Sequence, residues 1–133
     1  MKYAFLLSLA AALSCYVGPS IRNFEPAASA RGVQAYLRVG KQRTKVEGEL
    51  LAVRDSTLLV LRDGERVAVV PILLIRSARF EKVDLLIEGN RLSARDREQM
   101  RLFSRFPAGL TPELEARLLA VYGQSAADQV DLR

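Results

Sequence analysis

The sequence predicts a mainly β protein with α-helical additions: a small five-stranded antiparallel barrel over residues 33–83, followed by a C-terminal helical hairpin over 84–133. Short apolar runs separated by turn residues predict the strands, and an Asp-Gly pair at 63–64 predicts a hairpin among them. Two segments with helical spacing and capping residues follow residue 93. A chain of 133 residues, half of them apolar, is long enough for one domain with a core.

The strands are indicated by alternation and by their boundaries. Residues 33–39 alternate apolar and polar side chains before Gly40, as a half-buried strand does. Gly48 indicates a bend or bulge within the second strand, and Pro71 ends the fourth because its nitrogen cannot donate to a ladder. The four later strands are expected at residues 45–54, 57–62, 66–70 and 76–80.

The Asp63-Gly64 pair is the strongest local signal in this region. It lies between two apolar runs, and both of its residues tolerate the positive φ angles that a tight hairpin turn requires. We therefore expect residues 57–62 and 66–70 to pair in antiparallel fashion, with Asp63-Gly64 at the tip.

Capping residues define two helices. Ser93, with Asp96 three residues later, predicts the start of a helix at 94–105. Thr111 as N-cap, Pro112 in the first turn and Gly123 as C-cap predict a second helix.

The second helix has an apolar face that must be covered. We expect it to pack on the barrel, with the first helix and a binding partner as the alternatives. Residues 124–133 lack strong periodicity and are expected to fray. The apolar face consists of Leu114, Leu118, Val121 and Tyr122.

The N-terminus has the layout of a secretory signal peptide. Lys2 is followed by an apolar run over residues 3–13, which is too short for a stable membrane span. We assign residues 1–14 to the signal peptide. Residues 15–32 mix Gly, Pro, Ser and Ala without periodicity and are interpreted as a flexible tether, although Ile21 and Phe24 could instead dock on the domain.

The only cysteine follows this run. Ala12-Leu13-Ser14-Cys15 resembles the lipobox of bacterial lipoproteins. The resemblance implies that Cys15 is acylated, becomes the new N-terminus and anchors the chain to a membrane of the bacterial cell envelope, facing the periplasm or the exterior. Two alternatives stay open: cleavage after a later small residue, and an uncleaved apolar helix with a buried thiol.

The central region resembles the Sm-like small β-barrel, a variant of the SH3-type barrel. The likeness covers about fifty residues and implies a bent second strand that leads through an acidic turn into the third. Sm proteins that bind uridine-rich RNA usually have Asn where this chain has Ser56 or Thr57, and an Arg-Gly pair where it has Arg76-Ser77. These differences argue against nucleic acid as a partner. The matching residues are Val46, Gly48, Leu50, Val53, Asp55, Leu58 and Val60.

Basic residues crowd the first turn, around Gly40. Such a cluster can meet phosphate groups or anionic headgroups, or it can be a solvated loop that keeps a strand edge from pairing with another molecule. We favour the solvated loop, because Tyr36 is the only aromatic residue that interleaves the cluster. The cluster consists of Arg38, Lys41, Arg43 and Lys45.

Composition argues against most enzyme chemistries. A chain with no His and one Cys cannot build a thiolate-imidazole zinc site, an internal disulfide, or a Ser-His or Cys-His nucleophile pair. No pair of carboxylates is singled out for acid-base work, so we predict no catalytic residue, no cofactor and no metal. The net charge of +5 comes from 20 basic and 15 acidic residues, which make a mixed surface.

These observations predict a membrane-anchored, non-catalytic envelope lipoprotein that acts as an interaction or scaffold module. Whether it binds a protein partner or associates with itself stays open. The alternative is a cytoplasmic Sm-like protein that binds nucleic acid.

Overall fold

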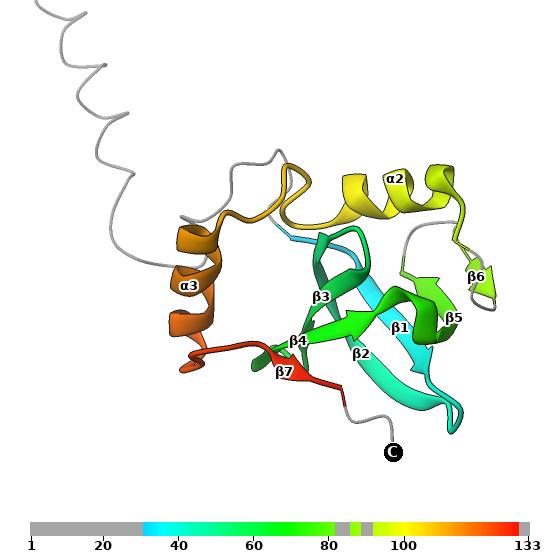
Figure 1. Cartoon of the computed structure of the whole chain (residues 1–133), viewed down its shortest axis with the longest axis horizontal. Helices are drawn as coiled ribbons and strands as arrows, with labels where there is room; N and C mark the ends of the chain where they lie inside the picture. The colour runs from blue at the N-terminus through cyan, green and yellow to red at the C-terminus, as the bar shows by residue number, and fades with distance from the viewer. Residues whose placement is uncertain (1–30, 82–85, 89–91, 131–133) are drawn as a thin grey trace, which may run out of the picture.

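The computed structural model describes residues 31–81, 86–88 and 92–130. The assigned signal peptide, Cys15 and nearly all of the assigned tether lie outside the described residues. Figure 1 shows a curved sheet with two helices beside it. In chain order the elements are β1 (Gln34–Val39), β2 (Thr44–Val53), β3 (Thr57–Arg62), β4 (Arg66–Pro71), the short 3-10 helix η2 (Ile72–Leu74), β5 (Ile75–Phe80), β6 (Leu86–Glu88), α2 (Ala94–Phe103), α3 (Pro112–Val121) and β7 (Asp128–Gln129).

The strands form one seven-stranded sheet in the order β6-β5-β1-β2-β3-β4-β7. Neighbours are antiparallel except β4 and β7, which are parallel. All five expected strands are present, each within one residue of its predicted ends. The β3–β4 hairpin is also confirmed, because Arg62 pairs with Arg66 across a turn in which Asp63 has φ 53° and Gly64 has φ 70°.

The sheet is open, and this corrects the expectation of a closed barrel. Closing five strands in the order β5-β1-β2-β3-β4 would require β4 to pair with β5. In the described residues the free edge of β4 pairs with β7 instead, and the free edge of β5 pairs with β6. The class of the fold, mainly β with α, is as predicted.

The bulge of β2 lies near the glycine that suggested it. The register between β2 and β3 shifts between Leu50 and Ala52, which leaves Leu51 as the extra residue. Gly48 itself lies close to β3, where an added Cβ would be 2.1 Å from the carbonyl oxygen of Leu61. A side chain at this position would therefore force the two strands apart.

Two apolar clusters lie on opposite faces of the sheet. The first cluster includes Leu37, Leu50, Val60 and Met100, and the second includes Leu51, Leu59, Leu61, Phe106 and Leu118. β3 contributes to both, since its neighbouring side chains point to opposite faces. This explains why the apolar run of β3 is continuous.

The helices start where their caps predicted. The Ser93 hydroxyl oxygen accepts a hydrogen bond from the amide of Asp96 (3.0 Å), and that of Thr111 accepts one from the amide of Leu114 (3.2 Å). α2 ends at Phe103, two residues before the expected end. The helices do not pack as a hairpin, because Met100 of α2 enters the first cluster and Leu118 of α3 enters the second.

The buried face of α3 differs by one position from the expected face. Leu118 and Leu119 are buried, and Leu114 and Tyr122 pack at the margin of the second cluster. Val121, which was expected on this face, is 45% exposed. Leu119 is buried instead, next to Leu118 in the second cluster.

Residues 124–130 are better ordered than their lack of periodicity suggested, and residues 131–133 lie outside the described residues. Ala68 and Val69 of β4 pair with Asp128 and Gln129 of β7. The side chain of the buried Gln124 bonds to the amide and the carbonyl of Val67, at 2.7 and 3.0 Å. The pairing of β7 extends the sheet, and the Gln124 side chain holds the segment that leads to it. Apolar periodicity reveals neither contact. None of the helices in the described part of the chain has the length and apolar character needed to cross a membrane.

Candidate functional site: a basic groove on β1, β2 and β5

The candidate site is a groove of about 450 Å³ on the face of β1, β2 and β5 that points away from the first cluster. The pleat sends Leu37 and Ala78 into that cluster and leaves their neighbours on the opposite face. The register then places Arg38 opposite both Lys45 of β2 and Ser77 of β5. We refer to this surface as the basic groove, and its remaining lining residues are Tyr36, Arg43, Glu47 and Arg79.

Positive charge dominates the basic groove. Arg38, Arg43, Lys45 and Arg79 line it together with a single carboxylate, Glu47. That carboxylate is already paired, since the Lys45 ammonium lies 3.1 Å from it. An anion entering the groove would meet several cations at once and little opposing charge.

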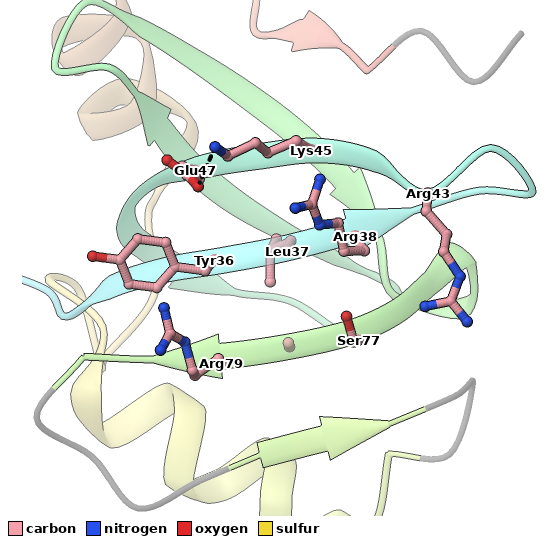
Figure 2. A pocket seen from close by; sticks show the side chains of 9 residues that line it. Tyr36, Leu37, Arg38, Arg43, Lys45, Glu47, Ser77 and Arg79 are labelled. Atoms are coloured by element: carbon pink, nitrogen blue, oxygen red, sulfur yellow. Dashed lines mark ion pairs between the residues drawn. The ribbon is translucent and has the colours of Figure 1, made fainter.

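An aromatic contact orders one end of the basic groove. The guanidinium carbon of Arg79 lies 4.8 Å from the centre of the Tyr36 ring, within the range of a cation–π interaction. The two residues are directly opposite each other on β1 and β5. Figure 2 shows Arg79 beside the ring, with Ser77 further along the same strand.

The turn between β1 and β2 positions the other end. Gly40 and Arg43 both have positive φ, 77° and 53°, and the Arg43 amide donates to the Gly40 carbonyl (3.1 Å). This geometry directs the Arg43 side chain toward the start of β5 (Figure 2). Lys41 lies exposed in the same turn but does not line the groove.

The sequence identified part of this site. Arg38, Arg43 and Lys45 belong to the predicted basic cluster, and the structure brings them together with Tyr36. Arg79 and Ser77 were missed, because only the register of β5 on β1 places them beside the cluster. The alternation within residues 76–80 was the available signal, since it puts Ser77 and Arg79 on one face.

The side chains of the groove are suited to binding anionic groups. Guanidinium and ammonium groups donate charge-assisted hydrogen bonds to phosphate or carboxylate oxygens, and the Ser77 hydroxyl can add another.

Several ion pairs lie outside the basic groove. Glu49 pairs with Arg105 at 2.5 Å between two nearly buried side chains, and Tyr122 lies in the same region. Burial raises the pKa of the Tyr122 hydroxyl, and the charge of Arg105 opposes that rise. Further pairs among the described residues are Arg54–Glu115, Arg66–Asp128 and Glu98–Arg101.

Within the described ranges, no three potential metal-ligating side chains gather into a group. Cys15, the predicted lipidation site, lies outside these ranges.

Comparisons of the chain with protein-family models, with curated proteins and with solved structures found no match.

Proposed function

We propose that the chain is a non-catalytic, membrane-anchored interaction module of the bacterial cell envelope whose basic groove binds anionic groups. One observation carries the binding part of this proposal: four cationic side chains and one carboxylate line the groove, so that Arg38, Arg43 and Arg79 remain in excess after Lys45 pairs with Glu47. The anchoring part is supported by the sequence before the described domain, where an apolar run and small residues lead to Cys15.

The anchoring part is tested by processing. The protein extracted from its native membrane should begin at Cys15 and carry the mass of acyl chains. It should stay in the membrane fraction, because several acyl chains on one residue hold a protein far more firmly than one chain. Cys15→Ala should carry no acyl mass and leave the membrane fraction. Identical fractionation of both proteins, with no acyl mass on either, would refute this part.

The binding part is tested with a short polyphosphate as the probe. In the full chain, Arg38→Glu combined with Arg79→Glu should weaken binding at least tenfold, because each change replaces an attractive charge with a repulsive one. Affinity should also fall as salt is raised. The control is Arg95→Glu, which reverses one exposed charge on α2 outside the groove. Equal losses of binding free energy per reversed charge in the groove variant and the control would show that net charge alone attracts the probe.

The alternative function is an Sm-like nucleic-acid-binding protein of the cytoplasm, and the likeness of β1–β5 to an Sm-like barrel stays a proposal with it. The stacked Tyr36 and Arg79 favour this alternative, because aromatic rings beside cations are a common platform for single-stranded bases. Tyr36→Leu separates the two functions. If it abolishes binding of a uridine-rich RNA but leaves polyphosphate binding intact, the alternative is supported; equal binding before and after the change contradicts it.

A further inference from the structure

Two turns lie side by side at one end of the sheet. The amide of Gly40, in the β1–β2 turn, donates to the carbonyl of Leu74 at 2.8 Å, and Val39 pairs with Ile75 next to it. We call the two turns together, residues 40–43 and 72–74, the tip. The tip adjoins the end of the basic groove that Arg43 lines.

The tip presents leucine side chains to solvent. Leu73 is 70% exposed, more than any other large apolar residue that the structure describes, and Leu74 is 37% exposed. On either side of them Ile72 and Ile75 are buried in the first cluster. The exposed leucines are therefore held on a turn that is fixed to the core.

Basic residues lie close to these leucines in the sequence of the two turns. Lys41 and Arg43 are in the first turn, and Arg76 follows Leu74 by two residues. The amide of Ile72 donates to the carbonyl of Ser56 (2.9 Å), so the exposed Asp55 is an acidic residue in the neighbouring turn. Lys41 and Arg43 are exposed in the turn that bonds to Leu74. An apolar point beside several cations matches the interface of an anionic bilayer, where acyl chains lie just below negative headgroups.

We propose that the tip docks on the anionic surface of a lipid bilayer, with Leu73 and Leu74 entering the boundary between headgroups and acyl chains. Lys41 and Arg43 contact the headgroups, with their aliphatic stems lying along the apolar surface. Two leucines are far less than a stable protein interface buries, but they are sufficient as a second contact for a chain that is already anchored. The inference rests on the proposed function in one respect, since the anchor keeps the bilayer within reach.

The length of chain before the domain permits this contact. The tip lies at the far end of β1 from Arg31, where the described domain begins (Figure 1). A six-residue strand is about 20 Å long, and residues 16–30 can span at most about 50 Å. A chain anchored at Cys15 can therefore turn its tip toward the membrane.

The absence of tryptophan from the sequence allows a direct test with the full chain. Leu73→Trp places a single tryptophan at the tip, and Leu102→Trp places one on α2 at a residue that is 55% exposed. Excitation at the red edge of the tryptophan band avoids the tyrosines. Leu102 serves as the control because it lies near the opposite end of β1. Its neighbour Phe103 accepts a hydrogen bond, through its carbonyl, from the amide of Val33, which directly precedes β1. Both proteins are added to vesicles of phosphatidylcholine and phosphatidylglycerol that carry brominated acyl chains.

The expected result is a blue shift and strong quenching for Leu73→Trp, with at least threefold weaker quenching for Leu102→Trp. Equal quenching at both positions, or none at Leu73→Trp, would overturn the proposal. Adding Arg43→Glu to the tip reporter should reduce its quenching severalfold, whereas adding Arg95→Glu, which changes the net charge by the same amount, should not. Loss of phosphatidylglycerol should have the same effect as the tip charge reversal, and quenching that ignores both changes would contradict the role of charge.

The outcome of the quenching experiment is independent of the outcome of the anchoring test. A chain without acyl mass that still shows selective quenching of Leu73→Trp refutes the anchor and supports the tip. An acylated chain whose two reporters are quenched equally refutes the tip and leaves the anchor standing.

Discussion

Arg105 joins three segments that are distant in sequence. Its guanidinium bonds to Glu49 of β2 at 2.5 Å, and its amide donates to the carbonyl of Leu50 (3.0 Å). The second oxygen of Glu49 accepts from the amide of Gly32 at 3.3 Å. Arg105 is 4% exposed, and its Nε and Nη1 atoms have no partner among the residues that the structure describes. The pair is therefore a buried ionic contact that depends on both partners being present.

Removing one partner should be costly. Arg105→Met leaves the Glu49 carboxylate nearly buried without its cation, and we expect a loss of about 3–5 kcal/mol in the free energy of unfolding. Adding Glu49→Gln should recover part of that loss, because no charge is then left uncompensated. Urea unfolding at neutral pH measures both effects. Lys45→Ala, which breaks an exposed pair, should cost less than about 1 kcal/mol, and a similarly small loss for Arg105→Met would contradict the argument.

Residues with local signals were the ones that the sequence predicted well. Ser93, Thr111 and Asp63-Gly64 act on neighbours within three or four positions, so their roles are visible in a short stretch of sequence. Arg105 and Arg79 look like ordinary surface arginines in the sequence. Their partners come from strands far away in the chain, and no local pattern encodes those pairings.

At the scale of elements, α3 is held by the side of the helix that faces the second cluster. Leu118 is completely buried there, so Leu118→Ala should lower the free energy of unfolding by about 2–5 kcal/mol, through lost burial and an incompletely filled cavity. Val121→Ala on the same helix is the matched control, and it should have little effect because Val121 is 45% exposed. Thermal unfolding compares the two variants. Equal decreases in melting temperature would contradict the assignment of Leu118, and not Val121, to the buried face of α3.

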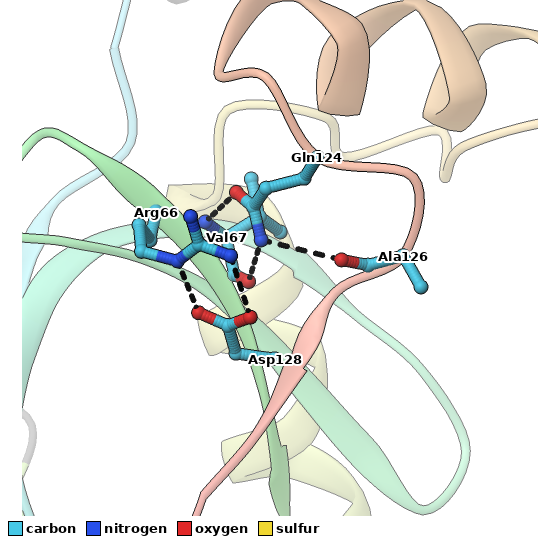
Figure 3. Close-up of polar contacts among 5 residues, drawn as sticks. All are labelled: Arg66, Val67, Gln124, Ala126 and Asp128. Atoms are coloured by element: carbon cyan, nitrogen blue, oxygen red, sulfur yellow. Dashed lines mark hydrogen bonds and ion pairs between the residues drawn. The ribbon is translucent and has the colours of Figure 1, made fainter.

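β7 depends on a charged contact with β4. Figure 3 shows the Asp128 carboxylate facing the Arg66 guanidinium, with bonds of 2.5 and 2.9 Å, and Gln124 bound to Val67 nearby. The hydrogen bond from Arg66, aided by the charge of that residue, lowers the pKa of the Asp128 carboxyl. A carboxyl whose pKa is lowered on folding stabilises the folded state above its unfolded pKa of about 4. That stabilisation is lost as pH falls through the lower, folded value.

The corresponding variant is Asp128→Asn. We expect it to be less stable than the wild type at neutral pH, and the difference should shrink as the pH falls below about 4, where the wild-type carboxyl also loses its charge. Urea midpoints measured across this range test the expectation. A difference that stays constant with pH would mean that the Asp128 charge does not contribute.

Elements differ in how much of them a local pattern encodes. The strands β1–β5 are long enough to show alternation or a continuous apolar run, and each was predicted within one residue. β6 and β7 have three and two residues, too few for any period, and they exist because an edge of the sheet accepts them. The same two strands decide that the sheet stays open, which is why closure was wrongly expected.

At the scale of the whole molecule, the two clusters are joined by β3, which contributes side chains to both. Leu58 and Val60 of β3 belong to the first cluster, and Leu59 and Leu61 belong to the second. Neither cluster can lose β3 without exposing the other. The described domain should therefore unfold as one unit.

This expectation is tested with one variant in each cluster. Met100→Ala and Leu118→Ala remove buried side chains from the first and second clusters, and both should shift the same single unfolding transition. Circular dichroism and tyrosine fluorescence should give coincident curves for each variant. Two separate transitions, each sensitive to only one variant, would show that the clusters unfold independently.

The junction at Gly32 determines how a mechanical load would enter the domain. A pull on the preceding chain reaches the amide of Val33, which is bonded to Phe103 (3.0 Å), and the carbonyl of Val33, which is bonded to Leu50 (2.9 Å). Gly32 itself lies so close to β2 that an added Cβ would be 1.9 Å from the carbonyl oxygen of Leu50. Tension is therefore shared between β2 and the end of α2 before it reaches the ladder of β1. A domain held this way resists being peeled from its first strand when its N-terminal end is fixed and the surroundings move.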